Sequence, residues 1–443
     1  MPQLVKSDAV AESLESAASL EVLPRNCKLE DYKKLRNVPV FSIKNDFIAY
    51  ASPDSTYALT RRLFDTAQEE IIIGIYDFSA EYMKELVLNA MQRGVKVSLM
   101  LDIDSKDEQV IFDELSRFGC NSVAAPSCAS KVVSYFPSSH EKVIVIDGTW
   151  TLVQSGNYSV NSIPFNEVDG GDPKHFRKGN RDMGVAIKSK PLADFFIKLL
   201  KRDMKLELDA EKAEALAGFV AAQLPEMVEA VPKLLPSKLF PSKTFSPSEA
   251  IKVTPVLTPD NYMDVIPGFI ESATKSIYIE NQYIRSSQAA IAKLLESIKK
   301  ARANNPQLDV RIVLGKLFGI KDFEKEKLNV ANLKTNFKLV LDKNIRYINT
   351  QRFVHCHNKV IIVDESSVLV SSQNWSGTGV ATNREAGLLM EYPQIAKYYT
   401  QIFESDWSTA FTKIPKPSAT VISPEALSKG NFVKVSPADY QEV

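Results

Sequence analysis

The chain has 443 residues, which is long enough for two domains that each bury a hydrophobic core. Its 54 basic and 54 acidic residues cancel. This balance argues against a general polyanion-binding protein, because such proteins carry a strong basic excess. A local basic pocket remains compatible with it.

The four cysteines, at 27, 120, 128 and 356, contain no CxxC pair and predict neither a zinc site nor a redox motif. We expect them to be reduced and the protein to be cytoplasmic, or peripheral to a membrane. The N-terminus has no basic segment followed by an apolar core, so no signal peptide is expected. No apolar stretch reaches the roughly 18 residues of a membrane-spanning helix.

The first regular pattern lies at residues 71–101. A β-branched apolar run at 71–76 predicts a buried strand, and helical spacing at 80–93 predicts a helix that Gly94 ends. Residues 95–101 predict the next strand. Strand, helix and strand in this order predict a βαβ unit and a mostly parallel sheet.

The second half repeats this order. Residues 271–279 correspond to 65–73, and a helix-like stretch at 288–302 and a strand at 308–314 follow. Any α/β protein contains such units, so the repeat becomes convincing only through the motifs that recur in both halves. Between the halves, residues 209–224 predict an amphipathic helix that packs on the protein or touches a membrane.

These patterns divide the chain into five parts. They are an N-terminal extension (1–44), a first lobe (45–205), a helix with a proline-rich connector (206–249), a second lobe (250–413) and a polar, loosely ordered tail (414–443).

Histidine is rare, with four in the chain, and two of them begin the same pattern. The two copies, each with His, Lys, Asp, Ser and Asn at identical spacing, are His140, Lys142, Asp147, Ser155 and Asn157, and His357, Lys359, Asp364, Ser372 and Asn374. One loose match is an ordinary accident of composition, but two complete matches at the same offsets are not.

Apolar runs place these residues on strands. Residues 143–146 and 360–363 predict two buried strands, and alternation puts each motif histidine and its lysine on one face. Each asparagine follows a further apolar run, at 151–153 or 368–370, so we expect it at the end of a neighbouring strand.

Two histidines near their working pKa can cleave a phosphodiester. One, neutral, attacks phosphorus and forms a phosphohistidine. The other, protonated, donates to the leaving alkoxide and then deprotonates water or an alcohol. Lysine and asparagine donors bind the equatorial oxygens. No carboxylate cluster indicates a metal, so neither a metal nor another cofactor is expected.

The doubled pattern resembles the HKD motif of the phospholipase D superfamily, over about residues 45–205 and 250–412. The resemblance implies an α/β fold of two similar lobes, each a mostly parallel sheet flanked by helices, that form an internal pseudo-dimer with one active site. A monomer then suffices. The resemblance also implies His140 as nucleophile and His357 as general acid and base. Matching tripeptides, Asn-Arg-Asp and Asn-Arg-Glu, would supply Asp182 and Glu385 to orient the histidines.

We accordingly assign three groups of residues. The catalytic group is His140, His357, Lys142, Lys359, Asp182 and Glu385. The phosphate-binding group is Lys142, Lys359, Asn157, Asn374, Ser155 and Ser372. Asp147 and Asp364 are expected to be structural. The family often has glycine before the motif serine, where this chain has Gln154 and Ser371.

The other two histidines allow two interpretations each. His355, two residues before His357, either lines the pocket or packs as an ordinary residue. His175 lies in a basic stretch at 174–181, which is either a solvated loop or a contact for an anionic part of the substrate.

Three functions remain open. Residues 277–283, Ile-Tyr-Ile-Glu-Asn-Gln-Tyr, resemble a segment of phospholipases D and favour hydrolysis or transphosphatidylation of a phospholipid at a membrane surface. The Asn-Trp-Ser ending at 374–376 and the basic stretch favour a superfamily nuclease acting on DNA or RNA, against the zero net charge. A non-catalytic binding protein is disfavoured because both motifs are complete. We therefore predict a metal-independent phospholipid phosphodiesterase.

Overall fold

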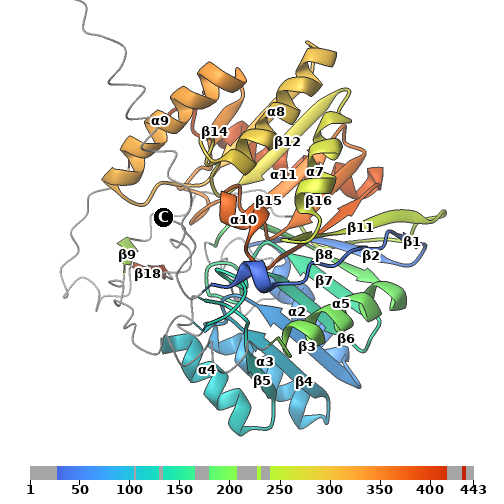
Figure 1. The fold of residues 1–443 in the computed structure, drawn as a ribbon. Coiled ribbons are helices and arrows are strands. Elements are labelled where there is room, and N and C mark those ends of the chain that lie inside the picture. Colours follow the sequence, from blue (N-terminus) through green and yellow to red (C-terminus); the bar gives the residue numbers. More distant parts are fainter. Residues whose placement is uncertain are drawn as a thin grey trace, which may run out of the picture.

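The computed structural model describes residues 27–103, 106–128, 133–164, 179–206, 227–230, 240–416 and 432–435. These residues form two α/β lobes stacked on each other, the first coloured blue to green and the second yellow to red (Figure 1). The predicted two-lobed α/β fold is confirmed.

The first lobe is built on an eight-stranded sheet with the order β10-β2-β8-β7-β6-β3-β4-β5. Its strands are β2 (Phe47–Ser52), β3 (Glu70–Ile75), β4 (Lys96–Leu101), β5 (Asn121–Ala124), β6 (Lys142–Ile146), β7 (Trp150–Gln154), β8 (Asp182–Lys188) and β10 (Lys243–Phe245). The predicted strands at 71–76 and 95–101 are β3 and β4.

The second lobe repeats this plan, with the order β1-β11-β17-β16-β15-β12-β13-β14. Its strands are β1 (Phe41–Ile43), β11 (Ile251–Thr258), β12 (Ser276–Asn281), β13 (Asp309–Leu314), β14 (Ile345–Tyr347), β15 (Lys359–Val363), β16 (Ser367–Ser371) and β17 (Glu385–Met390). A separate pair joins β9 (Met227–Ala230) to β18 (Phe432–Val435).

The prediction of mostly parallel sheets is wrong. In each lobe only the βαβ strands pair in parallel, namely β3-β4-β5 and β12-β13-β14. The other pairings, from β10 to β3 and from β1 to β12, are antiparallel. The physical reason is the tight turn that joins β6 to β7 and β15 to β16, because a short turn can connect only antiparallel neighbours.

The helices form corresponding sets in the two lobes. They are η1 (Leu29–Asp31), α2 (Thr56–Thr66), α3 (Glu81–Gln92), α4 (Lys106–Arg117) and α5 (Lys190–Asp203), and then α7 (Tyr262–Glu271), α8 (Ala289–Asn304), α9 (Ile320–Phe337), α10 (Gly377–Ala381) and α11 (Pro393–Thr409). The predicted helices at 80–93 and 288–302 are α3 and α8. None of the helices in the described ranges combines the length and the apolar character that crossing a membrane requires.

Three hydrophobic cores hold the layers together. One lies outside the first sheet under α2 and α3, and another lies outside the second sheet under α7 and α8. The third joins the inner faces of both sheets through apolar residues of α5 and α11. This shared core fixes the two lobes against each other, so a site between them is held rigidly.

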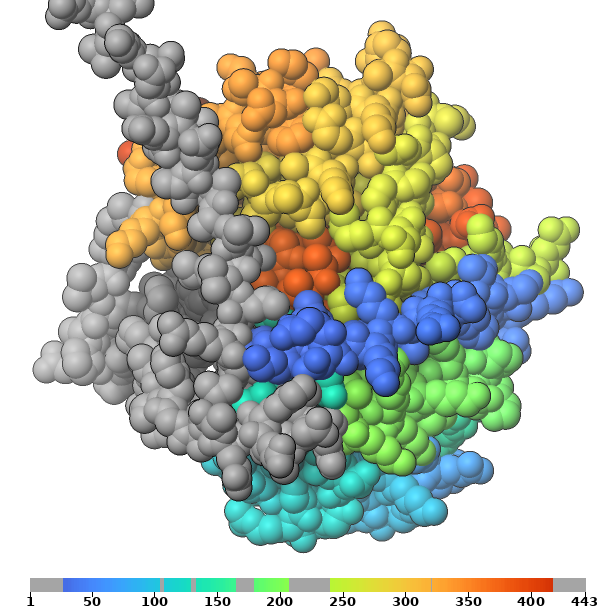
Figure 2. All heavy atoms as spheres, in the orientation of Figure 1, coloured from blue at the N-terminus to red at the C-terminus, as the bar shows by residue number. Residues whose placement is uncertain are grey.

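The lobes also exchange edge strands. β1 precedes the first lobe in sequence but pairs with β11 of the second, and β10 precedes the second lobe but pairs with β2 of the first. Figure 2 shows the first described residues, in blue, lying across the boundary between the lobes. The N-terminal extension and the connector therefore each contribute an edge strand to the sheet of a lobe.

The cysteine prediction is partly wrong, because Cys27 and Cys128 form a disulfide that closes a loop of 101 residues in sequence. Cys120 and Cys356 are free and buried. The spacing gave no sign of the pair, since the bridge depends on how the N-terminal segment folds back. Disulfides are typical of oxidising compartments, so this bond weighs against the expected cytoplasmic location.

Candidate active site

The two motif histidines meet where the lobes contact each other. His140 lies two residues before the start of β6, and His357 lies two residues before the start of β15. The His140 backbone N–H donates to the Arg384 carbonyl at 2.7 Å, and the His357 N–H donates to the Arg181 carbonyl at 3.0 Å. Each histidine is therefore anchored to the lobe that does not contain it.

The side chains cross in the same manner. His140 Nδ1 lies 2.9 Å from Glu385 Oε2, and His357 Nδ1 lies 3.0 Å from Asp182 Oδ1. A carboxylate at Nδ1 favours a hydrogen there, so Nε2 is the ring nitrogen that carries the lone pair in each neutral histidine. The predicted orienting carboxylates are thus present, and each comes from the opposite lobe.

Both motif lysines are buried beside their own histidines. Lys142 Nζ donates to the His140 carbonyl at 2.6 Å, and Lys359 Nζ donates to the His357 carbonyl at 2.6 Å. Lysine has three donor hydrogens. The contact with the histidine carbonyl uses one of them in each lysine, and it holds each ammonium beside its histidine.

Burial and the lysine charges keep both histidines neutral in the free protein. Burial lowers the pKa of His140 well below its usual range, and the charge of Lys142 adds to this. Burial and Lys359 lower the pKa of His357 to about 4, against the raising effect of Asp182. A dianionic or monoanionic phosphate entering here would oppose these effects and favour a protonated ring.

The neighbouring charges also affect Lys142 and Asp182. Burial lowers the pKa of Lys142 to about 7, with Glu385 opposing and Lys359 assisting that shift. For Asp182, burial raises the pKa, but His357 and its other donors outweigh burial, so the net pKa is lowered. The site therefore holds an ionised carboxylate and a lysine that titrates near neutrality.

The predicted phosphate-binding role of the two serines does not fit their contacts. Ser155 Oγ donates to Asp182 Oδ1 at 2.7 Å, and Ser372 Oγ donates to Glu385 Oε2 at 2.5 Å. A hydroxyl has one hydrogen to donate. The serines therefore support the orienting carboxylates and have no hydrogen left for the phosphate.

The two motif asparagines are buried after β7 and β16, as predicted. Both the amide oxygen and the amide nitrogen of Asn157 lack a hydrogen-bond partner among the described residues, and so does the amide oxygen of Asn374. A buried polar group without a partner is costly in a protein. The Asn157 amide nitrogen is therefore suited to donate to a substrate oxygen, and the two amide oxygens can accept from a donor of the substrate.

Asp147 and Asp364 lie away from the histidines, in the turns after β6 and β15. Asp147 accepts the backbone N–H groups of residues 68–70, and Asp364 accepts those of residues 274–276. Both have positive φ, 50° and 55°. Their contacts tie the motif turn to the start of β3 or β12, which agrees with a structural role.

Two buried ion-pair clusters flank the site, and sequence reasoning missed them. Arg181 Nε donates to Asp406 at 2.6 Å, and Arg384 Nε donates to Asp203 at 2.6 Å. Each arginine also contacts a carboxylate of its own lobe, Asp54 or Asp260. The repeated tripeptide placed an arginine beside each orienting carboxylate, but its partners are distant in sequence.

The remaining sequence candidates divide as follows. His355 is buried beside His357, with ring centroids 6.5 Å apart. Arg181, the last residue of the basic stretch, is fully buried in its ion pair and cannot contact a solvent-borne anion. His175, the amphipathic stretch at 209–224 and most of the predicted tail lie outside the described residues.

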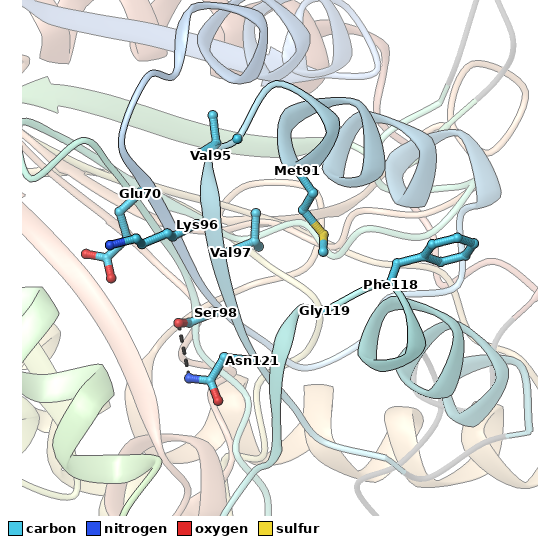
Figure 3. A pocket seen from close by; sticks show the side chains of 10 residues that line it. Glu70, Met91, Val95, Lys96, Val97, Ser98, Phe118, Gly119 and Asn121 are labelled. Atoms are coloured by element: carbon cyan, nitrogen blue, oxygen red, sulfur yellow. Dashed lines mark hydrogen bonds between the residues drawn. The ribbon is translucent and has the colours of Figure 1, made fainter.

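A surface cavity of about 430 Å³ lies elsewhere on the first lobe (Figure 3). It is lined by Glu70 and Lys96, which begin β3 and β4, and by Phe118. The site is at the opposite end of these strands, since Lys142 pairs with Ile75. The cavity contains no histidine and is separate from the candidate site. No group of His, Cys, Asp and Glu among the described residues is arranged to hold a metal.

Two lobes that each place a His-Lys motif against a carboxylate of the other define a class of two-motif α/β proteins. The sequence matches the family described as cardiolipin synthase, PLD-like domain, over residues 60–204 and 267–407, which is more than half of the chain. The chain belongs to this family and so to the phospholipase D superfamily, whose enzymes act on phosphodiesters.

Individual relatives are distant. The chain is 25% identical over 165 residues to a mitochondrial cardiolipin hydrolase of Canis lupus familiaris and 24% identical over 135 residues to that of Mus musculus. These matches cover 33% and 27% of this chain and 63% and 59% of the relatives, so less than two thirds of each relative is spanned. The crystal structure of phosphatidylserine synthase from Haemophilus influenzae Rd KW20 has the same fold, with a TM-score of 0.56 and 15% identity over 84% of this chain and 90% of that chain.

Proposed function

We propose that this protein hydrolyses or transfers the phosphatidyl group of a phospholipid, without a metal, through a phosphohistidine on His140. The observation that carries the proposal is the crossed pairing of each motif histidine with a carboxylate of the other lobe. This pairing gives two reactive Nε2 atoms in one site that a single chain completes, so a monomer suffices.

In the first step His140 Nε2 attacks phosphorus, and the bond from phosphorus to the headgroup oxygen breaks. His357, protonated when the anionic phosphate is bound, gives its Nε2 proton to that oxygen. In the second step neutral His357 takes a proton from water or an alcohol, whose oxygen attacks phosphorus and releases His140. Lys142, Lys359 and the motif asparagines bind the equatorial oxygens.

Two observations favour a lipid. The matching family is described by cardiolipin synthase, and the mitochondrial relatives are named as cardiolipin hydrolases. The basic stretch at 174–181 supports a nuclease less strongly, because its last residue, Arg181, is paired with Asp406. The protein would reach its substrate as a peripheral protein at the membrane surface.

The test compares wild type with His140→Ala in EDTA, on short-chain phosphatidylglycerol, short-chain phosphatidylcholine and single-stranded DNA. Headgroup release by wild type alone, and phosphatidylethanol on adding ethanol, is the expected result. An unchanged melting temperature of the variant shows that it is folded. Cutting of DNA without lipid turnover would replace the lipid with a nucleic acid, and a large loss in EDTA would contradict the metal-free mechanism.

A further inference from the structure

The two lobes differ two residues before each motif histidine. In the first lobe this position is Ser138, whose hydroxyl donates to Asp102 at 3.2 Å. In the second lobe it is His355, which is buried, with its ring centroid 6.5 Å from that of His357 and 5.0 Å from that of Phe318. A serine and carboxylate pair in the first lobe therefore corresponds to an imidazole in the second lobe.

The tautomer of His355 follows from its contacts. The backbone N–H of Lys316 donates to His355 Nδ1 at 3.0 Å. A backbone nitrogen can only donate, so Nδ1 carries a lone pair and the ring hydrogen is on Nε2. Nε2 is buried and has no hydrogen-bond partner among the described residues. The Nε2–H group of His355 is thus a donor held beside His357, and none of the described residues accepts its hydrogen.

The backbone around His355 is shaped to fit the ring. A Cβ atom on Gly315 would lie 2.1 Å from His355 Cε1 and 2.8 Å from Nδ1, so only glycine fits there. Gly315 follows β13 as Asp102 follows β4 in the first lobe. The carboxylate of one lobe and the space for an imidazole in the other therefore occupy corresponding places. The chain departs from its internal symmetry at both residues of this pair.

We propose that His355 binds the leaving group, with its Nε2–H donating a hydrogen bond to a hydroxyl oxygen of the headgroup. The inference rests on the proposed function, in which His357 protonates the leaving oxygen, because His355 is the ring beside His357. It makes His355 a specificity residue that favours headgroups with a hydroxyl near the scissile ester. Choline has no such acceptor, because its nitrogen carries three methyl groups.

The experiment measures kcat/KM on dihexanoyl phosphatidylglycerol and dihexanoyl phosphatidylcholine for wild type, His355→Asn and His355→Gln. The asparagine oxygen still accepts from Lys316, but its side chain has no donor at the place of Nε2. The glutamine amide nitrogen reaches that place. The preference for phosphatidylglycerol should fall about tenfold in His355→Asn and stay within about threefold of wild type in His355→Gln, as the loss and retention of one hydrogen bond require.

Ser138→Ala is the matched control in the first lobe, and its preference should equal that of wild type. Equal losses on both lipids in His355→Asn, or an unchanged preference, would overturn the role of His355 while leaving the proposed function intact. Cleavage of neither lipid by wild type would overturn the proposed function and this inference with it.

Discussion

His140 of the first lobe binds a carboxylate of the second, and His357 of the second lobe binds a carboxylate of the first. The same exchange appears in the edge strands and in the buried arginine clusters. The lobes differ at Ser138 and His355, which lie next to the reacting histidines. The framework is thus nearly symmetrical, while the residues two positions before the motif histidines are not.

A second difference concerns a buried carboxyl group that both lobes contain but that a different part of the lobe supplies in each. In the first lobe a buried carboxyl is supplied by Glu141 of the motif, and Gly74 on β3 leaves room for it. In the second lobe Glu280 on β12 supplies the carboxyl and receives a hydrogen bond from Asn358 at 2.8 Å. Burial raises the pKa of Glu141 to about 7 and that of Glu280 to about 8, and a neighbouring aspartate adds to each shift.

The largest expected effect is on kcat, and it comes from replacing the carboxylate that orients the motif histidine of each lobe. Glu385→Gln and Asp182→Asn should each lower kcat by roughly 10³-fold, because an amide no longer fixes the histidine tautomer or stabilises its positive charge. Steady-state assays with matched protein concentrations give the two values. Losses of less than tenfold in both variants would show that the crossed pairs do not support catalysis.

The arginine clusters should affect stability equally in both lobes. Arg384→Met and Arg181→Met each leave two carboxylates buried without their cation, which costs about 3–5 kcal/mol. Arg311→Met is the control, because its pairs with Asp309 and Glu404 are partly exposed and contribute less than about 1 kcal/mol. Urea denaturation measures the differences. A shift for Arg384→Met no larger than that for Arg311→Met would contradict the account.

The pH dependence of kcat/KM should separate the contribution of Lys142 from that of His357. The pKa of Lys142 is lowered to about 7 and that of His357 to about 4, so both lose protons as pH rises. kcat/KM should therefore fall from pH 5 to 9 and fall more steeply above pH 7, where Lys142 adds about tenfold per pH unit. Lys142→Arg stays charged and should remove only the steeper part. A profile that rises through pH 7 would contradict these assignments.

The sequence predicted the repeated strand and helix order because hydrophobic periodicity is local, as at 71–76 and 80–93. It identified the two motifs that the structure brings together because each motif is short and occurs twice. It could not show that Asp182 binds His357, since that choice depends on how the lobes pack. Nor could it show the Cys27–Cys128 bond, the exchange of β1 and β10 or the serine contacts with carboxylates, all of which join distant segments.

The most direct test of His140 as nucleophile and His357 as general acid and base uses a phosphodiester with a p-nitrophenyl leaving group. This group departs without protonation, so His357→Ala should complete the first step, stall at the second and accumulate a phosphohistidine. Intact-mass spectrometry after alkaline quenching, followed by peptide mapping, should place the adduct on His140 and find none in His140→Ala. An adduct on His357, or none in any variant, would contradict the assignment of His140 as nucleophile.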